Sequence, residues 1–287
     1  MDKKTPYPDS PKNGKIVILF LVKLGNIRKK GLTMIDLNFH ILPGVDDGAN
    51  SLVDSIALAK KAEENGITTI FATPHHKNGA YENPKQKILQ EVAWLNSKLK
   101  EEDINVSILP GQVTRIFGDI IDAYDADEIL TLNHTPYLLI ELPSNHVPRY
   151  TEQILFDLQM KALRPIIVHP ERHDGIIDHS DALYNLVKKG ALTQLSAASV
   201  SGELGKKIQK FSFELIESGM AHFIASEAHD LITRPCNLRE AYEEIEKQFG
   251  IQMRNLFQNN AQFILNNQTV LAEPPQRIRR KKFLGIF

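Results

Sequence analysis

The chain has 287 residues, of which 42% are hydrophobic and 24% are charged, and its formal net charge is -1 at pH 7. This composition is typical of a globular protein with a large core, and the near-zero charge gives no indication of nucleic acid binding or of attraction to a membrane surface. The single cysteine, Cys236, excludes an internal disulfide framework. Because one free cysteine is typical of a reducing compartment, we expect a cytoplasmic protein.

Residues 1–33 are more basic than the rest of the chain. Their apolar run at 16–22 is too short to span a bilayer, and no small-residue cleavage site follows it, which disfavours a signal peptide. We predict that 1–33 are a basic extension, disordered or not translated, and one hypothesis is that Met34, and not Met1, is the true start. An N-terminal mass of protein expressed from its native upstream region tests this, because residues before Met34 would reject it.

From residue 34 onward, apolar or β-branched segments alternate with helical patterns. We predict strands at 36–40, 67–72, 106–111, 137–140, 165–168, 191–195 and 221–225. We predict helices at 51–65, from 84 to about 100, at 150–163, 182–189 and about 205–218, and in two closing segments, with 119–128 irregular. This alternation indicates parallel strands with helical crossovers. About seven such units favour an α/β barrel, closed or nearly closed, over an open doubly wound sheet.

Local signals support several of these boundaries. Ser51 with Asp54 three residues later predicts a helix N-terminus, and Asn65-Gly66 predicts a left-handed stop. Pro84 is suitably placed to begin the next helix. These signals indicate where the predicted helices begin and end.

Polar residues stand at the ends of the predicted strands. In the extended segment 36–40, alternate side chains should point to one side, which would bring Asp36, Asn38 and His40 together. The other strand ends carry His75, Gln112 with Val113, Glu141, His169, Ser196, and Glu227 with His229. In an α/β barrel the site lies at the carboxyl ends of the strands. A lone histidine there is more often a satisfied core residue, but several converging ionisable groups indicate a metal or catalytic site, because burying them unpaired is costly.

Histidine and carboxylate without an available thiolate suit zinc, manganese or iron. Two or three such ions can activate water and stabilise a phosphoryl group during its transfer. Arg115, Arg172 and Arg234 each follow a predicted ligand segment, and a guanidinium matches the geometry of phosphate. Each of them could equally be an ordinary surface cation.

Five motifs together resemble the bacterial PHP-family protein-tyrosine phosphatases of capsule and exopolysaccharide operons. They lie at residues 36–48, 72–76, 109–112, 169–172 (His-Pro-Glu-Arg) and 225–229 (Ala-Ser-Glu-Ala-His), and the similarity runs from Met34 to Phe287. The resemblance implies a distorted (β/α)₇ TIM-like barrel of the PHP fold, a single domain at 34–270, with a basic C-terminal tail at 271–287. It also implies a trinuclear manganese site. The implied substrate is the tyrosine-rich tail of a cognate bacterial tyrosine kinase, and some relatives form homo-oligomers.

Mapped onto this chain, the resemblance implies a set of site residues. The implied metal ligands are His40, Asp47, His75, Glu141, His169 and His229, with Glu227 at a position where the family has aspartate. Arg172 and Arg234 match arginines near the phosphate, and Arg115 lies in a matching segment.

Three implied ligand positions depart from the family pattern. The family has histidine where this chain has Asn38, glutamate where it has Val113, and aspartate where it has Glu227. These three, with His40, would surround one ion. A cysteine of the family is also replaced, by Phe39. We therefore expect fewer than three ions, of manganese or of iron or zinc, and weak or absent phosphatase activity.

Two alternatives remain open. The chain could be a catalytically dead pseudophosphatase that binds the kinase tail. An amidohydrolase-type deaminase is disfavoured, because it would need the intact His-x-His pair and a terminal aspartate.

The basic cluster 277–282 could dock on an acidic partner or a membrane, but we favour a solvated chain end. We expect no nucleic acid partner and no transmembrane segment.

Overall fold

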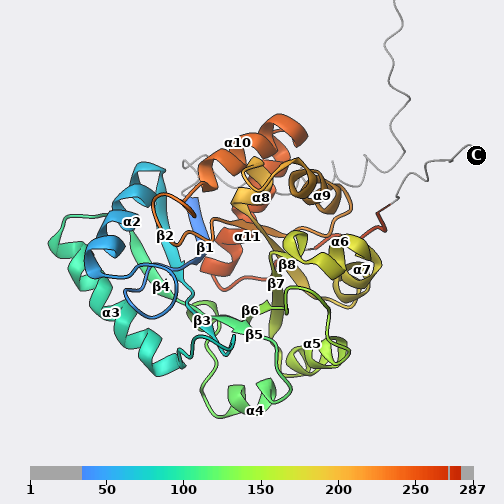
Figure 1. Cartoon of the computed structure of the whole chain (residues 1–287), viewed down its shortest axis with the longest axis horizontal. Helices are drawn as coiled ribbons and strands as arrows, with labels where there is room; N and C mark the ends of the chain where they lie inside the picture. Colours follow the sequence, from blue (N-terminus) through green and yellow to red (C-terminus); the bar gives the residue numbers. More distant parts are fainter. Residues whose placement is uncertain (1–33, 271, 279–287) are drawn as a thin grey trace, which may run out of the picture. The chain divides into compact units, whose positions relative to one another are not determined.

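The computed structural model describes residues 34–270 and 272–278, so the predicted basic extension and most of the tail lie outside the described part. The strands are β1 (Met34–Phe39), β2 (Ile67–Ala72), β3 (His75–His76), β4 (Ser107–Pro110), β5 (Val113–Arg115), β6 (Tyr137–Glu141), β7 (Arg164–Val168), β8 (Leu192–Ser196) and β9 (Phe223–Ala225). The helices are α2 (Leu52–Glu64), α3 (Lys85–Glu101), α4 (Ile120–Asp125), α5 (Thr151–Met160), α6 (Asp174–Asp178), α7 (Ser180–Lys188), α8 (Ala197–Ser201), α9 (Lys206–Glu217), α10 (Leu238–Phe249) and α11 (Ile251–Leu265). Figure 1 shows the helices arranged around the strands.

The strands pair in parallel in two sheets, in the orders β1-β2-β4 and β3-β5-β6-β7-β8-β9. Only two residues separate β2 from β3, and two separate β4 from β5. Backbone hydrogen bonds span this break, from Gly111 N to Ala72 O (2.9 Å) and from Val113 N to Pro74 O (3.1 Å). The two sheets are therefore successive parts of one set of seven strands.

Backbone hydrogen bonds also join the last strand to the first. Glu227 N donates to Asn38 O (3.0 Å), His40 N donates to Ala228 O (2.9 Å), and Phe39 pairs in parallel with Ala228. The first and last strands thus meet at their carboxyl ends. The prediction of an α/β fold of the distorted TIM-like barrel type in one domain is confirmed, and the distortion lies in the broken strands and in this limited contact.

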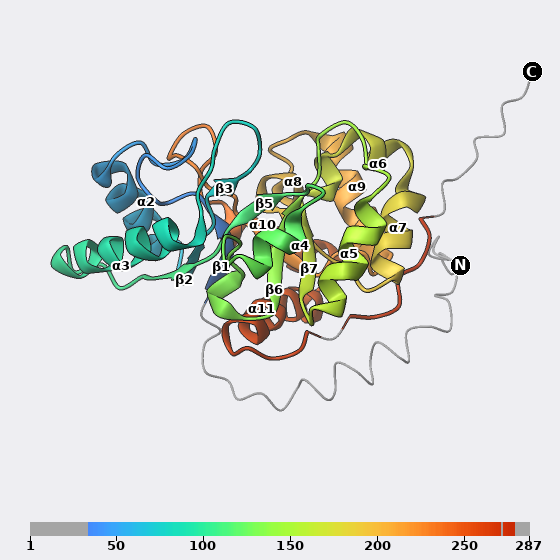
Figure 2. The same cartoon turned by 90° about the horizontal axis from the view of Figure 1, so that it is seen from below.

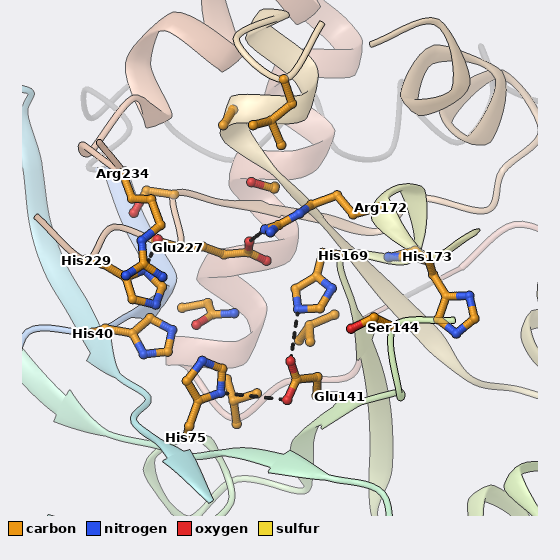
Figure 3. Close-up of a pocket in the computed structure, with 18 of the residues that line it drawn as sticks. His40, His75, Glu141, Ser144, His169, Arg172, His173, Glu227, His229 and Arg234 are labelled. Atoms are coloured by element: carbon orange, nitrogen blue, oxygen red, sulfur yellow. Dashed lines mark hydrogen bonds and ion pairs between the residues drawn. The ribbon is translucent and has the colours of Figure 1, made fainter. Parts of the chain in front are cut away.

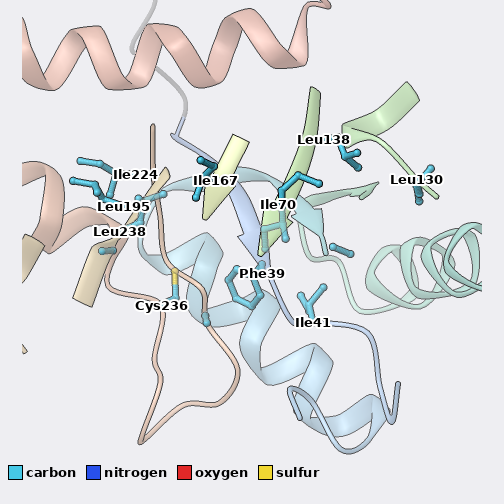
Figure 4. Close-up of a cluster of buried hydrophobic side chains, with 14 of the residues drawn as sticks. Phe39, Ile41, Ile70, Leu130, Leu138, Ile167, Leu195, Ile224, Cys236 and Leu238 are labelled. Atoms are coloured by element: carbon cyan, nitrogen blue, oxygen red, sulfur yellow. The ribbon is translucent and has the colours of Figure 1, made fainter. Parts of the chain in front are cut away.

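Two apolar clusters divide the core. One holds strand side chains together with Ala261 and Ile264 of α11, so it fills the inside of the strand ring above that helix. Figure 2 shows α11 below the strands. The other cluster packs strands against the surrounding helices, as Phe39, Ile70 and Ile167 illustrate in Figure 4. Because each large buried apolar side chain contributes about 1.5–3 kcal/mol, this core gives the strand ends a rigid support.

Several boundary signals predicted from the sequence are confirmed. The Ser51 hydroxyl accepts a hydrogen bond from Asp54 N (3.3 Å) at the start of α2, and Gly66 adopts φ +80° after that helix. One prediction was wrong, because the stretch at 119–128 contains α4. Ile120 and Ala123 are buried one turn apart, and their packing fixes this short helix in an otherwise polar segment.

The prediction that Asp36, Asn38 and His40 share one side was also wrong. The pairing of β1 with β2 shifts between Asp36 and Phe39, where two residues of β1 oppose one of β2, as in a β-bulge. Asn38 and His40 line the central cavity, whereas Asp36 accepts hydrogen bonds from Ser226 N (3.1 and 3.3 Å) and is not among the lining residues. The bulge thus separates Asp36 from its neighbours.

No helix within residues 34–270 and 272–278 is long and apolar enough to cross a membrane.

Of the basic cluster at 277–282, the structure describes Arg277 and Ile278. Arg277 forms an ion pair with Asp181 and lies 4.4 Å from the centroid of the Tyr184 ring, so it packs on α7. The prediction of a solvated end for the remaining cluster lies outside the described residues.

Candidate metal centre

A cavity of about 500 Å³ opens at the carboxyl ends of the strands. Its lining includes most of the predicted site residues, namely Asn38, His40, His75, Val113, Glu141, His169, Arg172, Glu227, His229 and Arg234. Asp47 and Arg115 are not lining residues but contact residues that are. Figure 3 shows lining side chains, among them His40, His75, Glu141, His169 and His229, converging on the cavity. The structure therefore gathers residues that lie up to 196 positions apart in sequence, from Asn38 to Arg234.

Four of the predicted ligands form the tightest group. Each of His40, Asp47, His75 and His229 offers one ligand atom, and these atoms all lie within 4.8 Å of one another. The Asp47 Oδ1 atom lies 3.6 Å from His229 Nε2 and 3.8 Å from His75 Nε2. The rings of His40 and His229 stack with centroids 3.7 Å apart. Three imidazoles and one carboxylate are a donor set suited to a divalent transition metal.

Asp46 orients this group and was not among the residues predicted for the site. Its Oδ2 lies 2.6 Å from His40 Nδ1 and accepts a hydrogen bond from His75 N (3.1 Å). Burial would raise the pKa of Asp46, but His40 and backbone donors hold that pKa well below its usual range. The carboxylate fixes the ring of His40, as partners of metal-binding histidines commonly do. The only sequence signal was the acidic pair formed with Asp47.

The loop that carries Asp46 and Asp47 needs a glycine. A Cβ atom at Gly48 would lie 2.1 Å from the carbonyl oxygen of His40, closer than any real contact. Gly48 N donates to Asp46 Oδ1 (3.0 Å), which helps to hold the carboxylate against His40. The glycine therefore lets the loop approach the end of β1 closely.

Two of the histidines have a buried ring nitrogen that makes no hydrogen bond within the described residues. His229 Nδ1 lies 2.6 Å from Glu227 O and donates to it, which leaves Nε2 without a partner. His75 Nδ1 is likewise buried without a hydrogen-bond partner. Burial, with repulsion from His40, lowers the pKa of His75 to about 4 and that of His229 to about 3. Both rings are therefore neutral at pH 7, the state that binds a metal, so these residues fit an ion.

Glu141 extends the site to a second histidine. Its carboxylate lies 3.8 Å from His75 Nδ1 and 3.7 Å from His169 Nε2, and Arg115 Nε donates to it (3.1 Å). His169 has φ +39°, a left-handed conformation that turns the chain at the end of β7. Burial chiefly lowers the pKa of His169. Glu141 and His169 are thus placed to hold a second ion beside the first.

The three positions that depart from the family pattern, Asn38, Val113 and Glu227, are engaged in hydrogen bonds or apolar packing. Asn38 Oδ1 accepts from the Thr73 hydroxyl (2.7 Å), and Asn38 Nδ2 donates to Gln194 Oε1 (2.9 Å). Gln194, which the sequence did not indicate, also donates to Glu227 Oε1 (3.0 Å). Val113 packs in the apolar interior and offers no donor atom. Within the described residues, the tight four-atom group does not include Asn38, Val113 or Glu227.

Each of the three predicted arginines pairs with a carboxylate of the site. Arg172 Nη1 donates to Glu227 Oε2 (2.9 Å), and Arg115 Nε donates to Glu141 Oε2 (3.1 Å). Arg234 Nη1 donates to Asp47 Oδ2 (2.8 Å), and its Nη2 donates to the Asp47 carbonyl (3.0 Å). Guanidinium groups so placed can share their remaining N–H donors with an anion in the cavity.

Comparisons with known proteins agree with the geometry. The family model of the capsular polysaccharide synthesis proteins CpsB/CapC matches residues 34–266. The tyrosine-protein phosphatase YwqE of Bacillus subtilis is 44% identical over 254 residues, which cover 88% of this chain and 100% of that protein. The putative tyrosine-protein phosphatase CapC of Staphylococcus aureus is 36% identical with the same coverage. A crystal structure from work on YwqE and on CpsB of Streptococcus pneumoniae, both metal-dependent tyrosine phosphatases, matches with a TM-score of 0.84 at 44% identity, over 86% of this chain and 100% of that one.

Proposed function

Because the chain belongs to the CpsB/CapC family of capsular polysaccharide synthesis proteins, we propose that it is a metal-dependent protein-tyrosine phosphatase. The observation that carries this proposal is the group of His40, Asp47, His75 and His229, whose ligand atoms lie within 4.8 Å of one another beside the Arg234 guanidinium. A cation-binding group next to an anion-binding guanidinium suits a phosphate ester.

The proposed roles follow from the geometry. His40, Asp47, His75 and His229 would hold one ion, and Glu141 with His169 would hold a second. Bound divalent ions would supply Lewis acidity toward phosphoryl oxygens and a nucleophile at neutral pH. Arg172 and Arg234 would bind and orient the phosphoryl oxygens through their free N–H groups, and Arg115 would hold Glu141 in place.

The proposed substrate is phosphotyrosine in the tyrosine-rich tail of a cognate bacterial tyrosine kinase, in the cytoplasm, within capsule or exopolysaccharide control. The motif resemblance and the match to the capsular polysaccharide family model support this context. Manganese is the proposed ion, with iron and zinc as candidates of similar ligand preference.

We also propose that turnover is weak and that fewer than three ions bind. Asn38 and Glu227 are engaged in hydrogen bonds with Gln194, and Val113 offers no donor. The same observation favours a second candidate, a pseudophosphatase that binds the kinase tail without hydrolysing it. Loss of a metal ligand should cost at least the ten- to hundredfold that loss of a ligand's partner typically costs.

One experiment separates these candidates. The purified protein is assayed with manganese on a phosphotyrosine peptide, and its metal content is counted in the same preparation. Slow turnover with one or two ions per chain supports the impaired phosphatase, and peptide binding without turnover supports the pseudophosphatase. Three tightly held ions per chain, or turnover comparable to that of a relative with all ligands intact, contradicts the proposed impairment.

A further inference from the structure

The loop at residues 230–234, here called the rim loop, directly follows His229 and borders the cavity. Asp230 Oδ1 accepts from the backbone N of Ile232 (2.6 Å), Thr233 (2.5 Å) and Arg234 (3.3 Å). Asp230 Oδ2 accepts from the Thr233 hydroxyl (2.5 Å). The Arg234 carbonyl in turn accepts from His229 N (2.9 Å) and Asp230 N (3.3 Å). The rim loop therefore holds its conformation through its own hydrogen bonds.

The two sides of the rim loop differ in chemistry. Arg234 donates to Asp47, and Figure 3 shows Arg234 beside His229 in the site. Leu231 and Ile232 point away from the core, with 49% and 88% of their surfaces exposed. This fixed turn displays two large apolar side chains next to the Arg234 guanidinium, and exposed apolar groups of this kind commonly mark interaction sites.

Another part of the cavity rim shares this apolar character. Leu204, between α8 and α9, lines the same cavity as Arg234 and is 40% exposed. Besides the Arg172 and Arg234 guanidiniums, this part of the rim carries carboxylates, since Glu203 also lines the cavity and Asp230 lies at the base of the rim loop. Acidic residues beside a bound phosphate would be repelled there, whereas apolar residues would bury surface against Ile232 and Leu204.

We propose that the rim loop binds the peptide segment beside the phosphotyrosine and selects apolar residues there, with Ile232 as the main contact. This inference rests on the proposed function, since Arg234 must hold the phosphate for the flanking residues to reach Ile232. The selected substrate class is a phosphotyrosine peptide with apolar neighbours on the phosphorylated residue.

The test measures binding, so it does not depend on turnover. Three non-hydrolysable phosphonates are titrated into the metal-loaded full chain: benzylphosphonate, and two tripeptides in which phosphonomethylphenylalanine is flanked by two serines or by two leucines. We expect the leucine-flanked peptide to bind about tenfold more tightly than the serine-flanked one, the gain from partial burial of a large apolar side chain. The substitution Ile232→Ser should remove most of this ratio.

Matched variants complete the design. Met160→Ser removes an apolar side chain that is 71% exposed on α5, away from the cavity lining, and should leave the ratio unchanged. Asp230→Ala should weaken all three ligands, because it frees the loop that carries Arg234. Equal binding of the two peptides, or a leucine preference that persists in Ile232→Ser, overturns the rim-loop proposal alone. Failure of benzylphosphonate to bind overturns the proposed function, and the rim-loop proposal with it.

Discussion

At the scale of single residues, the site depends on groups that hold the ligands as much as on the ligands. Asp46 fixes His40 and also accepts from the backbone of His75, so one carboxylate orients two members of the tight group. Such partners hold an imidazole ring in the orientation and tautomer that a metal needs. Asp46 is therefore expected to matter for metal affinity although it faces away from the ion.

The substitution Asp46→Asn tests this role. We expect manganese affinity to fall roughly ten- to hundredfold, because the neutral amide holds His40 less firmly. Metal titration by calorimetry measures the loss, and Asp122→Asn, an exposed acid on α4, is the control. Unchanged affinity in a folded Asp46→Asn protein would show that the contact is only structural.

The three residues that depart from the family's metal-ligand pattern allow a test of the proposed weak turnover. Asn38→His, Val113→Glu and Glu227→Asp, introduced together, should add a bound ion and raise turnover at least tenfold, since each restores a donor of the family pattern. Metal counting and a phosphotyrosine-peptide assay read the two effects separately. A folded triple variant that remained as slow as the starting protein would place the defect elsewhere.

At the scale of elements, buried polar residues join neighbouring strands. His222, just before β9, accepts at Nδ1 from Thr193 N of β8 (3.1 Å), and Asn260 of α11 donates to the His222 carbonyl (2.8 Å). Burial lowers the pKa of His222 to about 4. A proton on Nδ1 would face the Thr193 amide N–H, so protonation should break the contact between the strands.

This contact predicts a pH dependence of stability. The folded pKa of His222 lies below the unfolded value of 6.5, so the unfolded chain binds the proton more readily between these pH values. Stability is therefore retained above pH 6.5 and lost as pH falls toward 4, by roughly 2 kcal/mol at pH 5 from His222 alone. Urea unfolding of the metal-free protein at pH 7 and pH 5 measures it. His222→Gln should reduce the difference, while replacing the exposed His146 by Gln should not.

At the scale of the whole molecule, the metal centre joins segments from opposite ends of the barrel domain. His40 follows β1, and His229 follows β9, where hydrogen bonds connect the last strand to the first. An ion bound by both residues stabilises the folded state by mass action, because the unfolded chain does not bring them together. Metal binding and barrel stability should therefore be coupled.

We expect manganese at a hundred times its dissociation constant to stabilise the protein by about 2.7 kcal/mol. The thermal midpoint should rise with manganese and return to its starting value after chelation and dialysis. His229→Ala should abolish the manganese-dependent shift. A shift of the same size in that variant would mean that the ion binds elsewhere.

Much of this protein could be predicted from its sequence by itself. Strand and helix periods, the Ser51 cap and the Gly66 stop are local, because they depend on hydrogen bonds and backbone angles within a few residues. The polar strand ends predicted a site, since parallel strands bring their carboxyl ends to one rim. Those local signals led to the right fold class and to a set of site residues of which most line the cavity.

Only the tertiary structure decided the rest. The bulge that turns Asp36 away from Asn38 depends on how β1 pairs with β2, 31 residues further on at Ile67. The contact of Gln194 with both Asn38 and Glu227 joins β1 and β8 to the segment after β9, and the hydrogen bond from His75 N to Asp46 joins β3 to the loop after β1. Pairing register and long-range hydrogen bonds arise when distant segments pack together, so local sequence patterns do not specify them.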